Sequence, residues 1–135
     1  MSTKEKLKQY IWIKRNIEKL ECRLLEIESE LEKSTTCVSS DASGTGGLDK
    51  FGDLISAKIE IQENINLELL KSYKALSWIE KTIAKLNSIE QYLMGLRYIE
   101  GKSWRAIAKD MGYESAQVYR IHSAALDSLI KHDSQ

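Results

Sequence analysis

An apolar repeat between residues 10 and 31 constrains the fold more than any other feature of the sequence. The repeat advances in alternating steps of three and four residues and comprises Tyr10, Ile13, Ile17, Leu20, Leu24, Ile27 and Leu31. A seam of this kind predicts a coiled-coil helix, here from about Thr3 to Lys33. Because Ile11, Trp12 and Leu25 lie beside the seam, the apolar stripe is wider than one partner helix requires. We therefore expect a second partner and, most simply, a homodimer formed through this helix.

A second apolar stripe predicts another long helix, from about Leu48 to Leu86. Its members are Leu54, Ala57, Ile61 and Ile65, continued after one irregular step by Leu69, Leu76, Ile79, Ile83 and Leu86. Residues 34–47, between the two helices, have the Ser, Thr and Gly composition of a flexible loop that is long enough for the chain to reverse. The sequence contains no proline, which suits long uninterrupted helices. We expect an all-α fold in which residues 1–87 form a long antiparallel helical hairpin, a coiled coil.

Neither the cysteines nor the histidines indicate a chemical centre. Cys22 and Cys37 have no paired spacing and no nearby histidine, so they match neither a disulfide framework nor a zinc site, and we expect a reducing intracellular compartment. No Ser/His/Asp or Cys/His set can be assembled around His122 and His132. We expect His122 to be solvated or to pack by its edge, and the protein to be a non-enzyme without metal or cofactor.

The hydropathy pattern also argues against a membrane partner. No stretch approaches the ~20 apolar residues that a membrane-spanning helix needs, and no secretory signal is recognisable. We expect a soluble, cytoplasmic protein.

The C-terminal residues 88–135 have the local signals of two helices joined by a tight turn. Ser103 can cap a helix that runs to about Asp110, because its hydroxyl can accept a bond from an amide of the first turn. Gly112 follows as a residue that enters the left-handed region without a Cβ penalty. The second helix is expected from about Ser115 to Lys131.

The spacing of Ala108, Gly112, Val118 and Ile121 favours a DNA-binding helix-turn-helix. Two helices that cross near a tight turn need a small residue on the first helix, a turn-forming residue, and apolar anchors on the second. The opposite side of the second helix then faces outward, where it can meet DNA. The expected DNA-binding residues are Lys102, Arg105, Lys109, Ser115, Ala116, Gln117, Tyr119, Arg120 and Ser123. The alternative is an ordinary small helical hairpin that happens to contain an alanine and a glycine.

Four short motifs follow one another between residues 96 and 112. They are Leu96-Arg97, Gly101-Lys102-Ser103, Ile107-Ala108 and Met111-Gly112. In this succession the chain resembles region 4 of the primary bacterial sigma factors. As a whole it also resembles small phage and prophage proteins with a long helical N-terminal part, and it is similar to phage transcriptional regulators of the ArpU type. The resemblance implies a sigma region 4-like helix-turn-helix over residues 88–135, with double-stranded DNA and RNA polymerase as partners in the bacterial host cell.

The charge balance predicts weak DNA binding by the chain alone. Lys and Arg number 20, as do Asp and Glu, and from residue 88 onward six basic residues stand against six acidic ones. Because phosphate neutralisation supplies most non-specific affinity, binding needs the basic residues to gather on one side. Two alternatives therefore stay open. One is a sigma-like module that binds polymerase without base contacts; the other is a phage assembly protein resembling a small terminase subunit.

Overall fold

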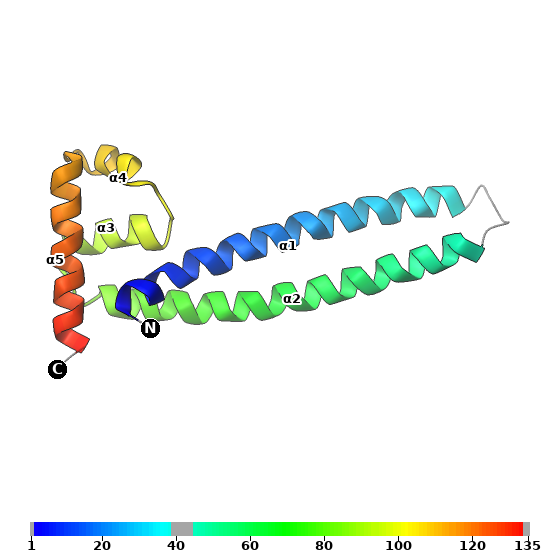
Figure 1. Ribbon diagram of the computed structural model, residues 1–135, viewed down its shortest axis with the longest axis horizontal. Helices are drawn as coiled ribbons and strands as arrows, with labels where there is room; N and C mark the ends of the chain where they lie inside the picture. Colours follow the sequence, from blue (N-terminus) through cyan, green and yellow to red (C-terminus); the bar gives the residue numbers. More distant parts are fainter. Residues whose placement is uncertain (1, 39–44, 134–135) are drawn as a thin grey trace. The chain divides into compact units, whose positions relative to one another are not determined.

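The computed structural model describes residues 2–38 and 45–133, and these residues are almost entirely helical (Figure 1). They form five helices and no strand, namely α1 (Thr3–Val38), α2 (Thr45–Ile83), α3 (Ser88–Tyr98), α4 (Trp104–Met111) and α5 (Ser115–Asp133). α1 and α2 pack against each other in opposite directions, so the expected all-α fold with an antiparallel hairpin is confirmed. None of the described helices is both long and apolar enough to cross a membrane.

Both hairpin helices reach further into the predicted loop than their apolar stripes indicated. α1 continues to Val38, beyond the expected end at Lys33, and α2 begins at Thr45 instead of Leu48. Polar Ser and Thr residues can continue a helix that tertiary packing already stabilises, although they contribute no apolar period. The rest of the predicted flexible loop, residues 39–44, lies outside the described residues.

The end of α2 comes earlier than expected. The helix stops at Ile83, and the Leu86 amide donates to the Ile83 carbonyl at 2.9 Å in the following turn. Asn87 then caps α3, because its side-chain oxygen accepts a bond from the Glu90 amide at 2.9 Å. The two helices are therefore separated by a short turn that leaves Leu86 buried.

Residues Arg15–Leu70 form one compact group, made of parts of α1 and α2. Ile17 and Ile61, from the two predicted stripes, are buried in it. Among the described residues, an ion pair joins the two helices, with Lys58 Nζ 3.8 Å from Glu28 Oε1. Several large apolar side chains of this group are exposed, namely Leu25, Ile55, Ile59, Leu67 and Leu70. Ile55 and Ile59 line a groove that Glu28 and Leu31 of α1 also border.

The other compact group joins Met1–Lys14 with Lys71–Gln135. Its core is one cluster to which every helix contributes, and α3, α4 and α5 pack on one another in pairs. The buried members are Leu7, Tyr10, Ile79, Leu86, Leu93, Met94, Leu96, Tyr98, Ile107, Ala108, Val118, Ala125 and Leu129. The domain division expected from the sequence, 1–87 and 88–135, stays a prediction; in the packing, the first turns of α1 belong with the C-terminal helices.

Candidate nucleic-acid interface

The connection between α3 and α4 is fixed by backbone and side-chain hydrogen bonds. The Lys102 amide donates to the Leu96 carbonyl at 3.0 Å, and Arg97 Nη1 donates to the Lys102 carbonyl at 3.0 Å. Gly101 has a φ of +73°, and a Cβ at this position would lie 3.0 Å from Ile11 Cδ1. The positive φ therefore favours glycine here, whereas the contact with the flexible end of Ile11 would be relieved by a small shift of that side chain.

α4 begins where the sequence predicted. Ser103 has extended backbone angles, and its side-chain oxygen accepts a bond from the Ala106 amide at 3.2 Å, which confirms it as the N-cap. Its inner face follows helical period, because Ile107 and Ala108 are buried while Trp104 and Met111 are partly buried against the same core.

The turn between α4 and α5 is formed by Gly112, as predicted. Its φ of 71° and ψ of 28° place it in the left-handed region. The Tyr113 amide donates to the Ala108 carbonyl at 3.0 Å and the Gly112 amide to Lys109 at 3.3 Å, so the last carbonyls of α4 find partners in the turn. No atom lies within 4 Å of a Cβ added to Gly112, so glycine is needed here for its backbone angles and not for space.

Replacing Gly112 by alanine should therefore lower the free energy of unfolding by about 1–2 kcal/mol, the usual cost of a Cβ in the left-handed conformation. Gly95 is the matched control, because it lies inside α3 with no atom within 4 Å of an added Cβ. Gly95→Ala should keep or raise stability by about 0.5–1 kcal/mol. Urea denaturation followed by circular dichroism measures both; equal losses in the two variants would contradict the assignment of the turn.

α5 has one buried and one exposed side. Val118, Ala125 and Leu129 are buried, and Ile121 is partly buried against the core. Most of the predicted DNA-binding positions of α5 lie outside this buried face, and each of these is exposed to solvent. They are Ser115, Ala116, Gln117, Arg120 and Ser123. Four of the five lie in the first two turns of the helix, immediately after Gly112.

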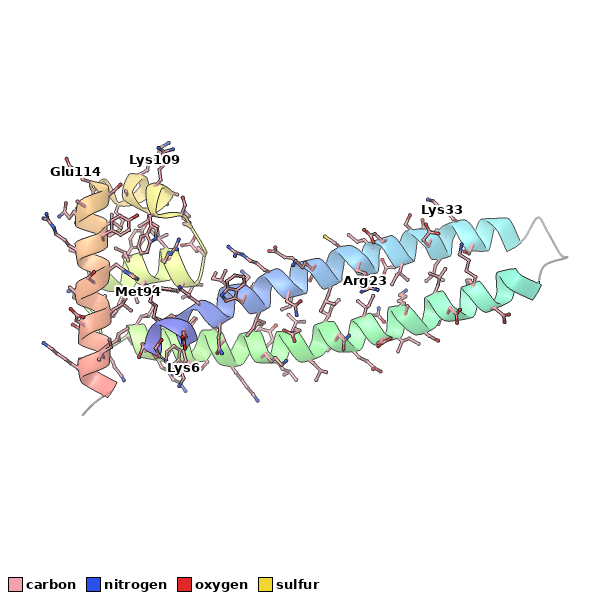
Figure 2. All side chains as sticks on the ribbon, viewed as in Figure 1. Lys6, Arg23, Lys33, Met94, Lys109 and Glu114 are labelled. Atoms are coloured by element: carbon pink, nitrogen blue, oxygen red, sulfur yellow. The ribbon has the colours of Figure 1, made fainter. Side chains whose placement is uncertain are left out.

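The basic residues predicted to contact phosphate differ in their surroundings. Arg105 and Lys109 are exposed on α4, and Figure 2 shows the Lys109 side chain extending away from the ribbon near the α4–α5 turn. Lys102 instead forms an ion pair with Asp110, with Nζ 2.5 Å from Oδ2, and this hydrogen bond raises the pKa of Lys102. Its charge is therefore balanced within the protein, whereas Arg105 and Lys109 have the freer access to a phosphate.

Tyr119 is partly covered by Trp104, so only about half of its side chain could contact DNA. Its side chain is 48% exposed, and its ring lies 5.1 Å from the Trp104 ring, tilted by 51°. The Arg97 guanidinium lies 4.4 Å from the centroid of the Trp104 ring, within the range of a cation–π interaction. Trp104 thus ties α4 to both α3 and α5.

His122 is buried, so of the two expected surroundings, solvent or edge packing, the structure shows the second. It is only 6% exposed, and its Nε2 lies 2.7 Å from the Tyr98 hydroxyl. Its ring stacks on Tyr98 and meets Trp104 edge to face at 4.7 Å, so the expected edge packing is present. Helical spacing could have predicted this burial, because His122 stands four residues after Val118 and three before Ala125, on the buried side of α5.

The surroundings of His122 keep its ring neutral. Burial, together with the positive charges of Lys4, Arg97 and Lys8, lowers the pKa of His122 to about 4. Burial also raises the pKa of Tyr98, so the hydrogen-bonded pair is uncharged at neutral pH. Tyr98, Trp104 and His122 therefore pack α3, α4 and α5 against one another.

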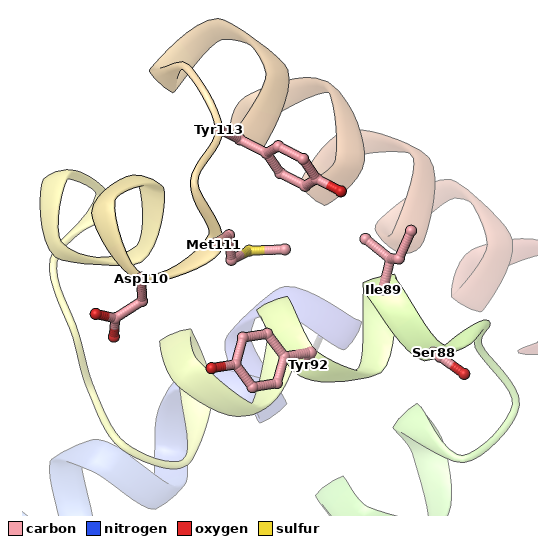
Figure 3. Close-up of a pocket in the computed structure, with 6 residues that line it drawn as sticks. All are labelled: Ser88, Ile89, Tyr92, Asp110, Met111 and Tyr113. Carbon is pink, nitrogen blue, oxygen red and sulfur yellow. The ribbon is translucent and has the colours of Figure 1, made fainter.

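A shallow groove opens between α3 and the α4–α5 turn (Figure 3). Ile89 and Tyr92 on α3 are about half exposed along it, and Asp110 and Met111 border it from α4. The groove holds no cluster of acid, base and nucleophile. Within residues 2–38 and 45–133, no three His, Cys, Asp or Glu side chains are grouped so that they could hold a metal ion.

Comparison with known proteins relates the chain to a sigma factor. It is 28% identical over 81 residues to the RNA polymerase sigma-G factor of Clostridium acetobutylicum. The match covers 60% of this chain but only 31% of the sigma factor, so the chain corresponds to a minor part of that protein. No protein-family model matches the sequence, and no solved structure matches it. The likeness supports a sigma-factor-like helical region in this chain.

Proposed function

We propose that the chain is a transcription regulator of phage or prophage origin that binds double-stranded DNA through α4 and α5. The observation that carries the proposal is the arrangement of α5, which buries Val118 and Ala125 and exposes Gln117 and Arg120 directly after the Gly112 turn. In helix-turn-helix proteins the second helix enters the major groove with its N-terminal residues against the base edges, while the first helix crosses the backbone.

The chemistry of the exposed residues assigns them separate roles in this proposal. Gln117 suits adenine and Arg120 suits guanine, because each side chain can form two hydrogen bonds to that base. Arg105 and Lys109 on α4 would contact phosphates, which positions the domain without reading sequence. Ser115, Ala116, Tyr119 and Ser123 complete the contact surface, and Lys102 would join it after exchanging its Asp110 partner for a phosphate.

The likeness to an RNA polymerase sigma-G factor supports polymerase as a second partner, in the cytoplasm of the bacterial host. The charge balance favours one alternative, a module that binds polymerase without base contacts. The net charge is zero, and the Lys102 charge is balanced by Asp110. Such a chain gains little from counterion release on its own, so polymerase would have to bring it to DNA.

Selection of bound sequences from a random duplex pool should yield a defined site for the full chain. Gln117→Ala and Arg120→Ala are then each expected to lose about 1–3 kcal/mol of discrimination at one position of that site. Arg105→Ala should instead weaken selected and scrambled duplexes alike and reduce the salt slope by about one. Arg23→Ala, which removes an exposed arginine of α1, is the control that should change neither property.

The same titrations separate the two candidate functions. If both α5 variants keep the preference of the unmodified protein for the selected site, α5 does not read bases. Footprinting with and without RNA polymerase then tests the alternative, which requires protection only when polymerase is present and the same protection by the Gln117→Ala variant.

A further inference from the structure

The outer side of α2 carries a charge pattern centred on Leu67. Glu63 and Glu60 precede Leu67 by four and seven residues, and Lys71 and Lys74 follow it by four and seven residues. Steps of four and seven keep side chains on one face of a helix, and α2 is uninterrupted from Thr45 to Ile83. The five side chains therefore form one stripe, acidic at its beginning, apolar at its centre and basic at its end.

The whole stripe is accessible to solvent. Leu67 is 58% exposed, as is Leu70 one turn further on, and the four charged residues are all exposed as well. The pattern also extends symmetrically, because the exposed Asp53 and Lys81 stand fourteen residues before and after Leu67. Each acidic residue before Leu67 is therefore matched by a basic residue at the same distance after it.

We propose that this stripe binds the same stripe of a second copy of the chain, antiparallel, about a twofold axis at Leu67. The axis would bring Glu63 of one copy opposite Lys71 of the other, and Glu60 opposite Lys74. Each contact occurs twice, as a twofold interface requires. A parallel pairing would instead place Glu63 against Glu63 and Lys71 against Lys71, so like-charge repulsion selects the antiparallel form.

The Leu67 stripe is a better binding surface for a second copy of the chain than the apolar seam of α1. Ile17 of the seam is buried, as is Ile61 of the α2 stripe, so the side of α1 that was expected to dimerise already packs within the chain. The Leu67 stripe faces outward and is complementary to itself. Its apolar content is small and its ion pairs are solvent-exposed, each worth at most about 1 kcal/mol. The dimer is therefore weak, and salt weakens it further because the screening length falls below about 10 Å above 0.1 M.

Sedimentation equilibrium of the full chain tests the proposal with variants in which the charges of the stripe are reversed. The unmodified protein should dimerise below about 1 mM in low salt and dissociate as salt rises. Glu60→Lys with Glu63→Lys, and separately Lys71→Glu with Lys74→Glu, should each weaken self-association about tenfold or more. An equimolar mixture of the two double variants should restore a one-to-one dimer, because each then presents the charge that the other lacks.

Glu26→Lys with Glu30→Lys is the matched control, since it makes the same charge change at exposed positions of α1 and should leave dimerisation intact. Circular dichroism verifies that every variant keeps its helicity. The proposal is overturned if the unmodified protein stays monomeric at about 1 mM in low salt, a range that would detect even weak dimers. It is equally overturned if the stripe variants associate as well as the control, or if their mixture stays monomeric. None of these outcomes depends on DNA binding, so the proposed function is tested separately.

Discussion

Replacing Ile107 by alanine is expected to lower the free energy of unfolding by about 2–5 kcal/mol, the range measured for large-to-small changes in tightly packed cores. Ile107 is completely buried and belongs to the cluster that α3, α4 and α5 share. α4 has only eight residues, so it depends on this packing more than on intrinsic helix stability. Removing the anchor should therefore release α4 and disturb the presentation of α5.

Ile89→Ala is the matched control for this change. Ile89 lies in the first turn of α3 in the same compact group, but its side chain is 49% exposed. Its truncation should cost less than about 1 kcal/mol, as surface substitutions usually do. Urea denaturation followed by tryptophan fluorescence compares the two variants. A loss for Ile107→Ala no greater than for Ile89→Ala would show that α4 is not anchored by this side chain.

Features of the C-terminal unit that depend on neighbouring residues could be predicted from the sequence. Ser103 as a helix cap and Gly112 as a left-handed turn follow from the chemistry of single residues, and the structure contains both. The buried pair Ile107-Ala108 follows from helical period. These features are local, so the sequence within one or two turns determines them.

Features that depend on distant residues could not be predicted in this way. Leu7 and Tyr10 belong to the same core as the C-terminal helices, although α1 stands at the other end of the sequence. The Lys102–Asp110 pair spans a loop and most of α4, beyond the spacing at which helical side chains meet. The exposed sides of α5 and α2 are visible in the sequence, but what they bind depends on molecules that the chain does not contain.

The last expected result concerns the buried histidine and the stability of the C-terminal helices in acid. The pKa of His122 is about 4 in the folded protein, whereas an unfolded histidine titrates near 6.5. Between these values the unfolded chain binds a proton that the folded protein does not. Stability from this residue is therefore complete above pH 6.5 and is lost as the pH falls toward 4.

Burial of the His122 ring is the main cause of this effect, and the charges around it add to it. Lys4 and Lys8 from α1 and Arg97 from α3 oppose protonation, and the hydroxyl of Tyr98 occupies Nε2 without supplying a negative charge. Linkage then predicts a loss of about 2 kcal/mol between pH 7 and pH 5 and about 3 kcal/mol by pH 4. This loss adds to whatever the carboxylates contribute over the same range, so it must be isolated by comparison with a variant.

His122→Gln isolates the histidine contribution, because glutamine is polar but does not titrate. Its stability should be lower than that of the unmodified protein at pH 7, since the ring contacts with Tyr98 and Trp104 are lost, yet it should fall about 2 kcal/mol less between pH 7 and pH 5. His132→Gln, which removes the exposed histidine near the end of α5, should keep the full pH dependence. Urea denaturation at the two pH values measures each difference. An equal fall for the unmodified protein and His122→Gln would mean that His122 protonates as readily in the folded protein as in the unfolded chain, and that its burial between α3, α4 and α5 does not govern acid stability.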